Sequence, residues 1–323
     1  MNEEQTFSLD NFPADHKSGF VAVVGKPNVG KSTLVNRLVG QKVAIVSPKP
    51  QTTRSRILAI LTREHAQVIF VDTPGIHRPR HELGKAMVDA ATRTLPDSDV
   101  VAFVVDVSQP PSEADEEIAA LIRQQTESPV ILVMNKMDLL SADQVEAHTR
   151  AYWKLLPGHD DALPSITERE KGEDWMMTIA TEGVNLSELL DRIIALLPQG
   201  PRYYPGEQVT DQTERQIAAE LIREQVLYHI HQEVPHAVAV VVNEFKEREG
   251  GTVYIAANIF VEKDSQKGII IGKGGKRLRK IGSAARREIE RMTNANVYLD
   301  LWVKVNKGWR KDASQLRRLG LIR

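Results

Sequence analysis

The octapeptide GKPNVGKS at residues 25–32 constrains this chain more than any other feature of its sequence. It follows the apolar run FVAVV, opens a helical pattern at Lys31, and fits the pattern GxxxxGK[ST]. Between a strand and a helix, such a loop turns backbone N–H groups around nucleotide phosphates, its lysine reaches the β- and γ-phosphates, and its hydroxyl can bind Mg²⁺. The motif alone also arises by chance in tight turns, so the rest of the chain must support it.

Short apolar runs alternate with helical patterns through the first 200 residues. Strands are predicted at residues 20–24, 66–72, 99–107 and 129–136, and helices at 31–40, 81–95, 113–125 and 185–197. This order predicts an α/β fold, a mostly parallel sheet with helices on both faces. The acidic stretch 157–174 has no periodicity, and we expect a surface insertion or long loop there.

Two further motifs follow predicted strands of this sheet. Asp72-Thr73-Pro74-Gly75 could hold Mg²⁺ through water and meet a γ-phosphate, so that loss of that phosphate moves the next loop. Asn135-Lys136-Met137-Asp138 ends the next strand but one, and an ionised Asp138 accepts two hydrogen bonds, which matches the N1–H and N2–H₂ donors of guanine. Adenine lacks these donors, and rejection on that basis can reach about 10⁴. The three motifs together make a chance match untenable.

The second part of the chain has a different organisation. LPQGPRYYPGE, residues 197–207, carries three prolines and two glycines and is the predicted domain boundary. Beyond it come a helical pattern at 213–230, strand-like runs at 236–248 and 252–262, the strand-like run GIIIG, a basic helix at 276–292 and a strand at 295–305. We expect a small α+β domain with the order helix, strand, strand, helix, helix, strand.

A second glycine turn, Gly272-Lys273-Gly274-Gly275, lacks the Ser or Thr that would hold magnesium. A second nucleotide site is therefore not expected. A GxxG loop between two helices is the feature with which KH domains clamp about four nucleotides of single-stranded RNA, although GxxG also occurs in many ordinary turns. Residues 267–280 contain six lysines and arginines and no acidic residue. Such a charge run alone is usually a solvated helix face, but within a KH-like domain and next to the apolar run GIII it favours phosphate contact. Further on, Trp302 is expected in the core, whereas Trp309 is open to either a core or a base-stacking interpretation.

The net charge of −1 conceals an asymmetry between the two parts of the chain. Residues 1–200 hold 20 Lys+Arg against 28 Asp+Glu, a net −8, while residues 201–323 hold 22 against 15, a net +7. This opposition suggests that the second part meets a polyanion. The chain has no cysteine, which excludes disulfides and cysteine-ligated metals, and no apolar run approaches the roughly 20 residues that span a bilayer.

With these motifs in this order, the sequence resembles the translation-factor-like GTPases and, within them, the Era family of bacterial ribosome-assembly GTPases. The resemblance runs from Phe20 nearly to the C-terminus and implies a GTPase domain followed by a type II KH domain. The domains expected are a mobile leader (1–17), a GTPase domain (18–198), a linker (199–212), a KH domain (213–310) and a C-terminal tail (311–323).

The resemblance also implies the residues of each site. Thr53, with Thr52 as the near alternative, corresponds to the magnesium-binding threonine of switch I, beside Ser32 and Asp72. The residues expected at the GTP phosphates are Gly25, Lys26, Pro27, Asn28, Val29, Gly30, Lys31, Ser32, Thr33, Asp72, Thr73, Pro74, Gly75 and Ile76. Those expected to act in catalysis are Lys31, Asn28, Asp72, Gly75 and Thr53. Those expected at the guanine are Asn135, Lys136, Met137, Asp138 and Ala180. Those expected at RNA are Gly272, Lys273, Gly274, Gly275, Lys276, Arg277 and Lys280.

Two positions depart from the patterns of related proteins. Ras-like GTPases carry a glutamine that orients water where this chain has Ile76, so we expect slow intrinsic hydrolysis that depends on Lys31, Mg²⁺ and positioning. In related GTPases with an apolar residue there, an asparagine at the place of Asn28 helps hold a potassium ion, and the same role is expected here. Ile179 replaces the serine of the guanine loop, although Ala180 keeps a backbone N–H to offer the guanine oxygen.

The resemblance implies a GTP-hydrolysing switch that binds the 3′ end of 16S rRNA and assists assembly of the 30S subunit. The expected partners are GTP or GDP and that RNA, and the protein is expected to be a cytoplasmic monomer. Two alternatives stay open: an RNA-binding assembly factor with GTP as a structural ligand, and a regulator that associates peripherally with the inner membrane through its basic surface.

Overall fold

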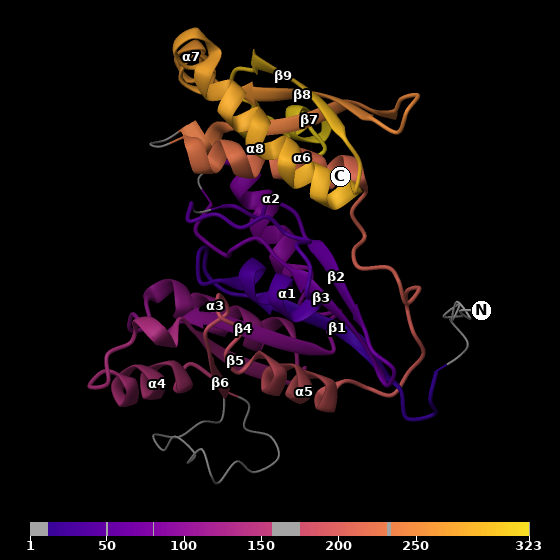
Figure 1. The fold of residues 1–323 in the computed structure, drawn as a ribbon. Coiled ribbons are helices and arrows are strands. Elements are labelled where there is room, and N and C mark those ends of the chain that lie inside the picture. The colour runs from indigo at the N-terminus through magenta and orange to yellow at the C-terminus, as the bar shows by residue number, and fades with distance from the viewer. Residues whose placement is uncertain (1–11, 50, 80, 157–174, 231–233, 323) are drawn as a thin grey trace, which may run out of the picture. The chain divides into compact units, whose positions relative to one another are not determined.

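The structure is a computed structural model that describes residues 12–49, 51–79, 81–156, 175–230 and 234–322. Two compact units divide the chain (Figure 1). Unit 1 comprises residues up to 44 together with 55–78 and 87–211, and unit 2 comprises 212–323 together with 45–54 and 79–86. The position of one unit relative to the other is not determined, so each is described by itself.

A six-stranded sheet forms the centre of unit 1, with the strand order β2-β3-β1-β4-β5-β6. Its strands are β1 (Lys17–Val24), β2 (Ile57–Thr62), β3 (Ala66–Asp72), β4 (Val100–Asp106), β5 (Val130–Asn135) and β6 (Trp175–Thr178). The helices of this part of the chain are α1 (Lys31–Val39), α2 (Glu82–Thr92), α3 (Glu113–Gln125), α4 (Val145–Trp153) and α5 (Leu186–Leu196). Only β2 runs antiparallel to its neighbour, β3. The predicted mostly parallel α/β fold is confirmed.

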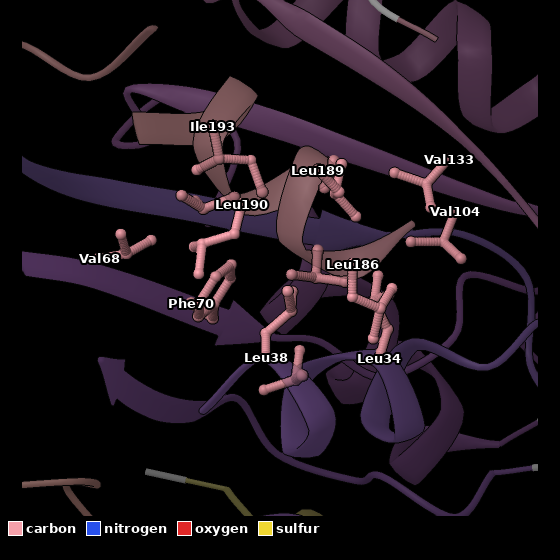
Figure 2. Packing of buried hydrophobic residues seen from close by; sticks show 14 of the residues in the cluster. Leu34, Leu38, Val68, Phe70, Val104, Val133, Leu186, Leu189, Leu190 and Ile193 are labelled. Atoms are coloured by element: carbon pink, nitrogen blue, oxygen red, sulfur yellow. The ribbon is translucent and has the colours of Figure 1, made fainter. Parts of the chain in front are cut away.

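Both faces of this sheet are covered by helices, as a parallel sheet requires. On one face, Leu34 and Leu38 of α1 and Leu189 of α5 pack against Phe70 and Val104 of the strands (Figure 2). On the other face, α3 and α4 contribute Ile118, Ile122, Tyr152 and Trp153 to a second apolar cluster. Burying one such leucine contributes roughly 1.5–3 kcal/mol, so the two clusters hold the carboxyl ends of the strands in fixed positions.

Unit 2 contains a three-stranded sheet of order β7-β8-β9. Its main elements are α6 (Glu214–His229), β7 (Ala239–Glu247), β8 (Val253–Val261), α7 (Asp264–Ile271), α8 (Lys276–Thr293), β9 (Val297–Val305) and the short α9 (Ala313–Arg318). β8 pairs antiparallel with β7 and parallel with β9. The core lies between one face of the sheet and the helices, where Ile222 of α6 and Ile281 and Ile289 of α8 meet Ile255 and Ile259 of β8. The predicted α+β element order is confirmed.

Two predictions for unit 2 are wrong. The run GIII is not strand-like but forms the end of α7, and Ile270 is its fully buried position. A short apolar run has no decisive period, and here the flanking residues 264–267 extend it into a helix. Trp302 is not in the core, since 61% of it is exposed, whereas Trp309 is completely buried. Trp302 lies on the outer side of β9, opposite to the side that packs on the helices.

The ends of unit 1 are tied to its sheet. The ring of His16 is buried and lies 2.9 Å from the carbonyl oxygen of Gly200, and Gln67 Oε1 accepts the N–H groups of Tyr203 and Tyr204. The first residues of the predicted linker therefore lie beside the amino ends of β1 and β3. Residues 1–11 of the expected leader and the expected insertion at 157–174 lie outside the described residues, and the domain boundaries stay predictions. None of the described helices is long and apolar enough to cross a membrane.

Candidate nucleotide and RNA sites

The glycine loop between β1 and α1 is tightly enclosed by its neighbours. Gly30 adopts a φ of 106° as it starts α1, and a Cβ added there would lie 2.2 Å from the side-chain amide nitrogen of Asn135. A side chain is therefore excluded by both the backbone conformation and the space. The first turn of α1 carries no acidic residue, so its N–H groups and dipole are available to an anion.

Lys31 occupies the centre of this loop. Its Nζ donates to the carbonyl oxygens of Gly25, at 3.0 Å, and Lys26, at 2.8 Å, and only 6% of the residue is exposed. Burial lowers the pKa of Lys31 to about 8, an effect that the charge of Asp72 partly opposes. A buried ammonium held by two carbonyls is a suitable partner for a polyphosphate.

The end of β3 brings a carboxylate to the start of α1. Ser32 Oγ donates to Asp72 Oδ2 at 2.6 Å, and Asp72 is completely buried. Next to it, Thr73 Oγ1 donates to the carbonyl oxygen of Val23 at 2.8 Å and holds this turn against β1. A hydroxyl and a carboxylate beside a phosphate loop form the hard oxygen donor set that Mg²⁺ prefers, so Ser32 and Asp72 fit the expected ion.

The turn after β3 closes against the phosphate loop. A Cβ on Gly75 would lie 2.5 Å from the backbone nitrogen of Pro27, so only glycine allows this approach. The N–H of Ile76 donates to the Gly25 carbonyl at 3.2 Å, and its side chain joins the buried cluster of α3 and α4. Ile76 thus anchors the turn in the core and cannot orient a water molecule. His77 Nδ1 lies 2.8 Å from the Gly75 carbonyl oxygen.

Asn135 connects the phosphate loop to the loop after β6. Its amide nitrogen donates to the Val29 carbonyl at 2.8 Å, and its Oδ1 accepts from Thr178 Oγ1 at 3.2 Å and from the Ala180 N–H at 3.0 Å. In this structure the Ala180 N–H is donated to Asn135, and its expected contact with the guanine oxygen stays a prediction. Asn135 is 2% exposed and acts as a buried brace.

The remaining guanine candidates lie at the end of β5. Lys136 adopts a positive φ of 63°, and its Nζ forms an ion pair of 2.6 Å with Asp106 at the end of β4. Burial by itself raises the pKa of Asp106. Hydrogen bonds from Lys136 and Ser108, together with the positive charge of Lys136, outweigh burial, so the pKa of Asp106 is lowered. This pair fixes the residues that precede Asp138, whose side chain is exposed, as an acceptor for a base must be.

Sequence inspection missed the contribution of α3 to the phosphate loop. Asp115 is completely buried. Its Oδ2 forms an ion pair of 2.6 Å with Lys26 and accepts a hydrogen bond of 2.8 Å from the backbone N–H of Ser112. The sequence carried a signal for this helix start, because a serine followed three residues later by an acid, here Ser112 and Asp115, is typical of a capping box. On the same helix, Glu113 and Glu117 pair with Arg78, two residues after Ile76. Acidic groups of α3 thus hold both loops that flank the candidate phosphate site.

The candidate switch threonines are part of unit 2, in the segment 45–54. Within that unit the carbonyl oxygen of Thr52 accepts from Arg223, and the guanidinium of Arg54 donates to the Val238 carbonyl at 2.5 Å and lies 5.7 Å from the centre of the Trp309 ring. Burial, together with the positive charge of Arg223, lowers the pKa of Arg54 to about 9. The role of Thr53 as a magnesium ligand beside Ser32 and Asp72 of unit 1 therefore stays a prediction.

The second glycine loop connects α7 to α8. Gly272, Gly274 and Gly275 all have positive φ, at 69°, 59° and 73°, and Gly275 starts α8, whose first turn contains no acidic residue. Arg277 donates to the Ile269 carbonyl at 2.5 Å and Arg279 to the Gly274 carbonyl at 2.8 Å, so two arginines brace the loop. Lys273, Lys276 and Lys280 are exposed. The loop thus presents exposed cations on a braced backbone.

Comparison with known proteins identifies both halves of the chain. Residues 20–136 match a family described as 50S ribosome-binding GTPase, and residues 233–310 match the KH domain. A crystal structure of Era with MgGDPNP and nucleotides 1506–1542 of 16S ribosomal RNA is similar over 95% of this chain and 100% of that one, with 38% identity and a TM-score of 0.87. A variant of Era from Aquifex aeolicus bound to GDP·AlF4⁻ is similar over the same shares, with 39% identity and a TM-score of 0.87.

Proposed function

The chain belongs to the Era family, and on that premise we propose that it is a GTP-hydrolysing switch that binds the 3′ end of 16S rRNA and assists assembly of the small ribosomal subunit. The observation that carries the proposal is the chemical difference between its two glycine loops. The first has Ser32 beside Asp72 and a buried lysine, whereas the second has exposed lysines and no hydroxyl or carboxylate for a metal.

In unit 1, the residues of the phosphate loop bind the α- and β-phosphates through backbone N–H groups, and Lys31 neutralises charge at the β- and γ-phosphates. Ser32, Asp72 and Thr53 would hold Mg²⁺, Asp72 through water. Mg²⁺ bound there would supply positive charge that offsets the negative charge of the phosphates. Gly75 offers its N–H to the γ-phosphate, and hydrolysis releases that contact.

The base is selected by Asp138, which accepts the two guanine donors. Asn135, Lys136 and Met137 hold this acceptor in place, since Lys136 is fixed by Asp106 and Asn135 by Val29. Ala180 can contribute its N–H to the base only if Asn135 releases it. Guanine selectivity therefore depends chiefly on Asp138.

Hydrolysis without a partner is slow, because Ile76 is buried in the core and supplies no polar group to the attacking water. Asn28, at a positive φ of 66° in the phosphate loop, would help hold a potassium ion, which would supply additional positive charge at the phosphates. Equal GTP turnover in sodium and potassium buffers would exclude this role for Asn28.

In unit 2, the loop from Gly272 to Gly275 clamps the RNA backbone, and Lys273, Lys276, Arg277 and Lys280 meet its phosphates. Each neutralised phosphate on a single strand adds about 0.7 to the slope of log affinity against log salt. The GTP-bound state favours docking on an immature 30S subunit, and hydrolysis favours release.

The test is GTP turnover by the full chain with and without the 3′ segment of 16S rRNA, with a scrambled RNA of equal length as the control. The proposal predicts that the native segment, and not the scrambled one, changes the turnover rate. A rate that is the same under all three conditions would favour the alternative in which GTP is only a structural ligand.

We further propose that the protein acts in the cytoplasm as a monomer and that its basic surface also contacts the inner membrane peripherally. The exposed cations beside the GxxG loop support this, since clustered lysines are attracted to anionic lipid at about 1 kcal/mol each. Sedimentation with anionic vesicles tests it, and binding to them should weaken when the loop lysines are replaced and when salt is raised.

A further inference from the structure

The outer face of the three-stranded sheet in unit 2 carries aromatic side chains that the core does not use. Tyr298 and Trp302 of β9 are 60% and 61% exposed. Tyr254 of β8 is the register partner of Tyr298, and their rings stack with centroids 5.8 Å apart and 22° between the planes. We name this surface, Tyr254, Tyr298 and Trp302, the aromatic face. Large exposed aromatic rings on adjacent strands mark a binding surface more often than scattered apolar side chains do.

The aromatic face is held in a fixed geometry. The indole N–H of Trp302 donates to Asp300 Oδ2 at 3.1 Å on the same side of β9, so the ring is already oriented. Tyr298 is ordered by its stacking on Tyr254. Because less side-chain freedom is lost when a ligand binds, such rings are prepared to stack on a flat partner.

The charges beside these rings favour a nucleic acid over an apolar partner. The guanidinium carbon of Arg248 lies 3.9 Å from the centre of the Tyr254 ring, and Lys304, two residues after Trp302, is exposed on the same side. Asp300 and Glu244 of this side both have partners, since Asp300 accepts from Trp302 and Glu244 pairs with Lys246 at 3.0 Å. Rings flanked by cations bind single strands, whose bases stack while the cations meet phosphates.

The aromatic face also lies in the same unit as the GxxG loop. β9 is an edge strand of the sheet, and its other side packs against α7, the helix that ends at Ile271, just before Gly272. A GxxG loop clamps only about four nucleotides, so a longer strand held there must continue over another part of the surface.

We propose that the aromatic face is a second RNA subsite, where unpaired bases of the strand clamped at the GxxG loop stack on Trp302 and Tyr298. The inference rests on the proposed RNA-binding function and extends it to residues that none of the motifs includes. Stacking is tolerant of base identity, so this subsite adds affinity and length dependence without adding sequence preference.

Trp302 provides its own probe, because the other three tryptophans, Trp153, Trp175 and Trp309, are at most 6% exposed. Acrylamide quenching of the full chain therefore reports mainly on Trp302. With the 3′ segment of 16S rRNA bound, quenching should fall, and with an RNA cut to about four nucleotides it should stay as in the free protein.

Affinity gives the second readout. W302A should bind the long RNA roughly 5- to 150-fold more weakly, the range expected for one stacked base, while W302F, which keeps an aromatic ring, should stay close to the wild type. The affinity of W302A for the four-nucleotide RNA should be unchanged. Y228A is the matched control, since Tyr228 is a 49% exposed aromatic residue on α6.

The outcomes separate this inference from the function on which it rests. If the wild type binds the long RNA and W302A binds it equally well, with unchanged quenching, the subsite is excluded while the proposed function stands. If anionic vesicles, and not RNA, protect Trp302 from acrylamide quenching, the aromatic face belongs to a membrane contact and the inference is wrong. If the wild type binds neither RNA, the proposed function itself fails.

Discussion

Lys31 shows how a single residue is prepared for its ligand. Its ammonium is buried, bonded to two carbonyls, and next to the carboxylate of Asp72. Burial outweighs that carboxylate, so the free protein holds the proton of Lys31 less firmly than an exposed lysine would. A bound polyphosphate reverses the balance and raises the pKa again. Nucleotide binding is therefore coupled to protonation of this residue.

The coupling predicts a specific dependence on pH. The pKa of Lys31 is about 8 in the free protein and 10.5 in the unfolded chain, so as pH rises above about 8 the free protein loses the proton that phosphate binding needs. GDP affinity should fall as pH rises from 7 to 9. Over the same range the unfolded state binds more protons than the folded state, so the contribution of Lys31 to the stability of the free protein rises with pH.

Equilibrium binding of GDP between pH 7 and 9 checks the prediction, with K31R as the control because a guanidinium stays charged throughout. The guanine base of GDP titrates in the same way with both proteins. The difference between their slopes of log affinity against pH therefore reports the titration of Lys31. Equal slopes for wild type and K31R would show that Lys31 does not lose its proton in this range.

At the scale of elements, α3 contributes more than core packing. Its first turn carries Asp115, which caps the helix and pairs with Lys26 of the phosphate loop. Leaving a buried charge without its partner costs about 3–5 kcal/mol, and Lys26 is partly exposed, which reduces the cost at this site.

D115A should therefore lower the free energy of unfolding in urea by about 2–4 kcal/mol and weaken GDP binding, since the phosphate loop loses its anchor. The control is E116A, an exposed residue on the same turn, which should change neither. A double-mutant cycle of K26M with D115N isolates the pair. Strictly additive effects on stability would mean that the ion pair contributes nothing.

The elements also show how far the sequence alone could lead. The P-loop, the strand-ending motifs and the GxxG turn predicted both folds, because glycine, lysine and carboxylate at those spacings have few other uses. GIII was misassigned because a four-residue apolar run fits a strand or a helix, and the residues before it decide. Trp302 was misassigned because alternation along β9 does not reveal which side packs on the helices. The pairs Lys26–Asp115 and Arg54–Val238 join residues far apart in sequence, which no local pattern shows.

At the scale of the whole molecule, two loops that each present glycine and lysine serve different phosphates. The net −8 of residues 1–200 and the net +7 of residues 201–323 agree with this division: a nucleotide needs one focused site, whereas an RNA strand benefits from an extended positive field. The site of unit 1 is built from buried groups, and that of unit 2 from exposed lysines around a braced backbone. Binding at the two sites should therefore be separable by substitution.

The most direct test of that division is to measure the dissociation constants for GTP and for the 3′ segment of 16S rRNA in the variant that combines K273D with G274D. A Cβ at Gly274 meets no atom within 4 Å, and Asp tolerates a positive φ better than most residues, so the loop can fold with both acids. A neutral pair, K273Q with G274N, controls for loss of glycine. We predict that the acidic variant loses RNA binding and keeps the wild-type GTP affinity, whereas loss of both affinities together would contradict the account.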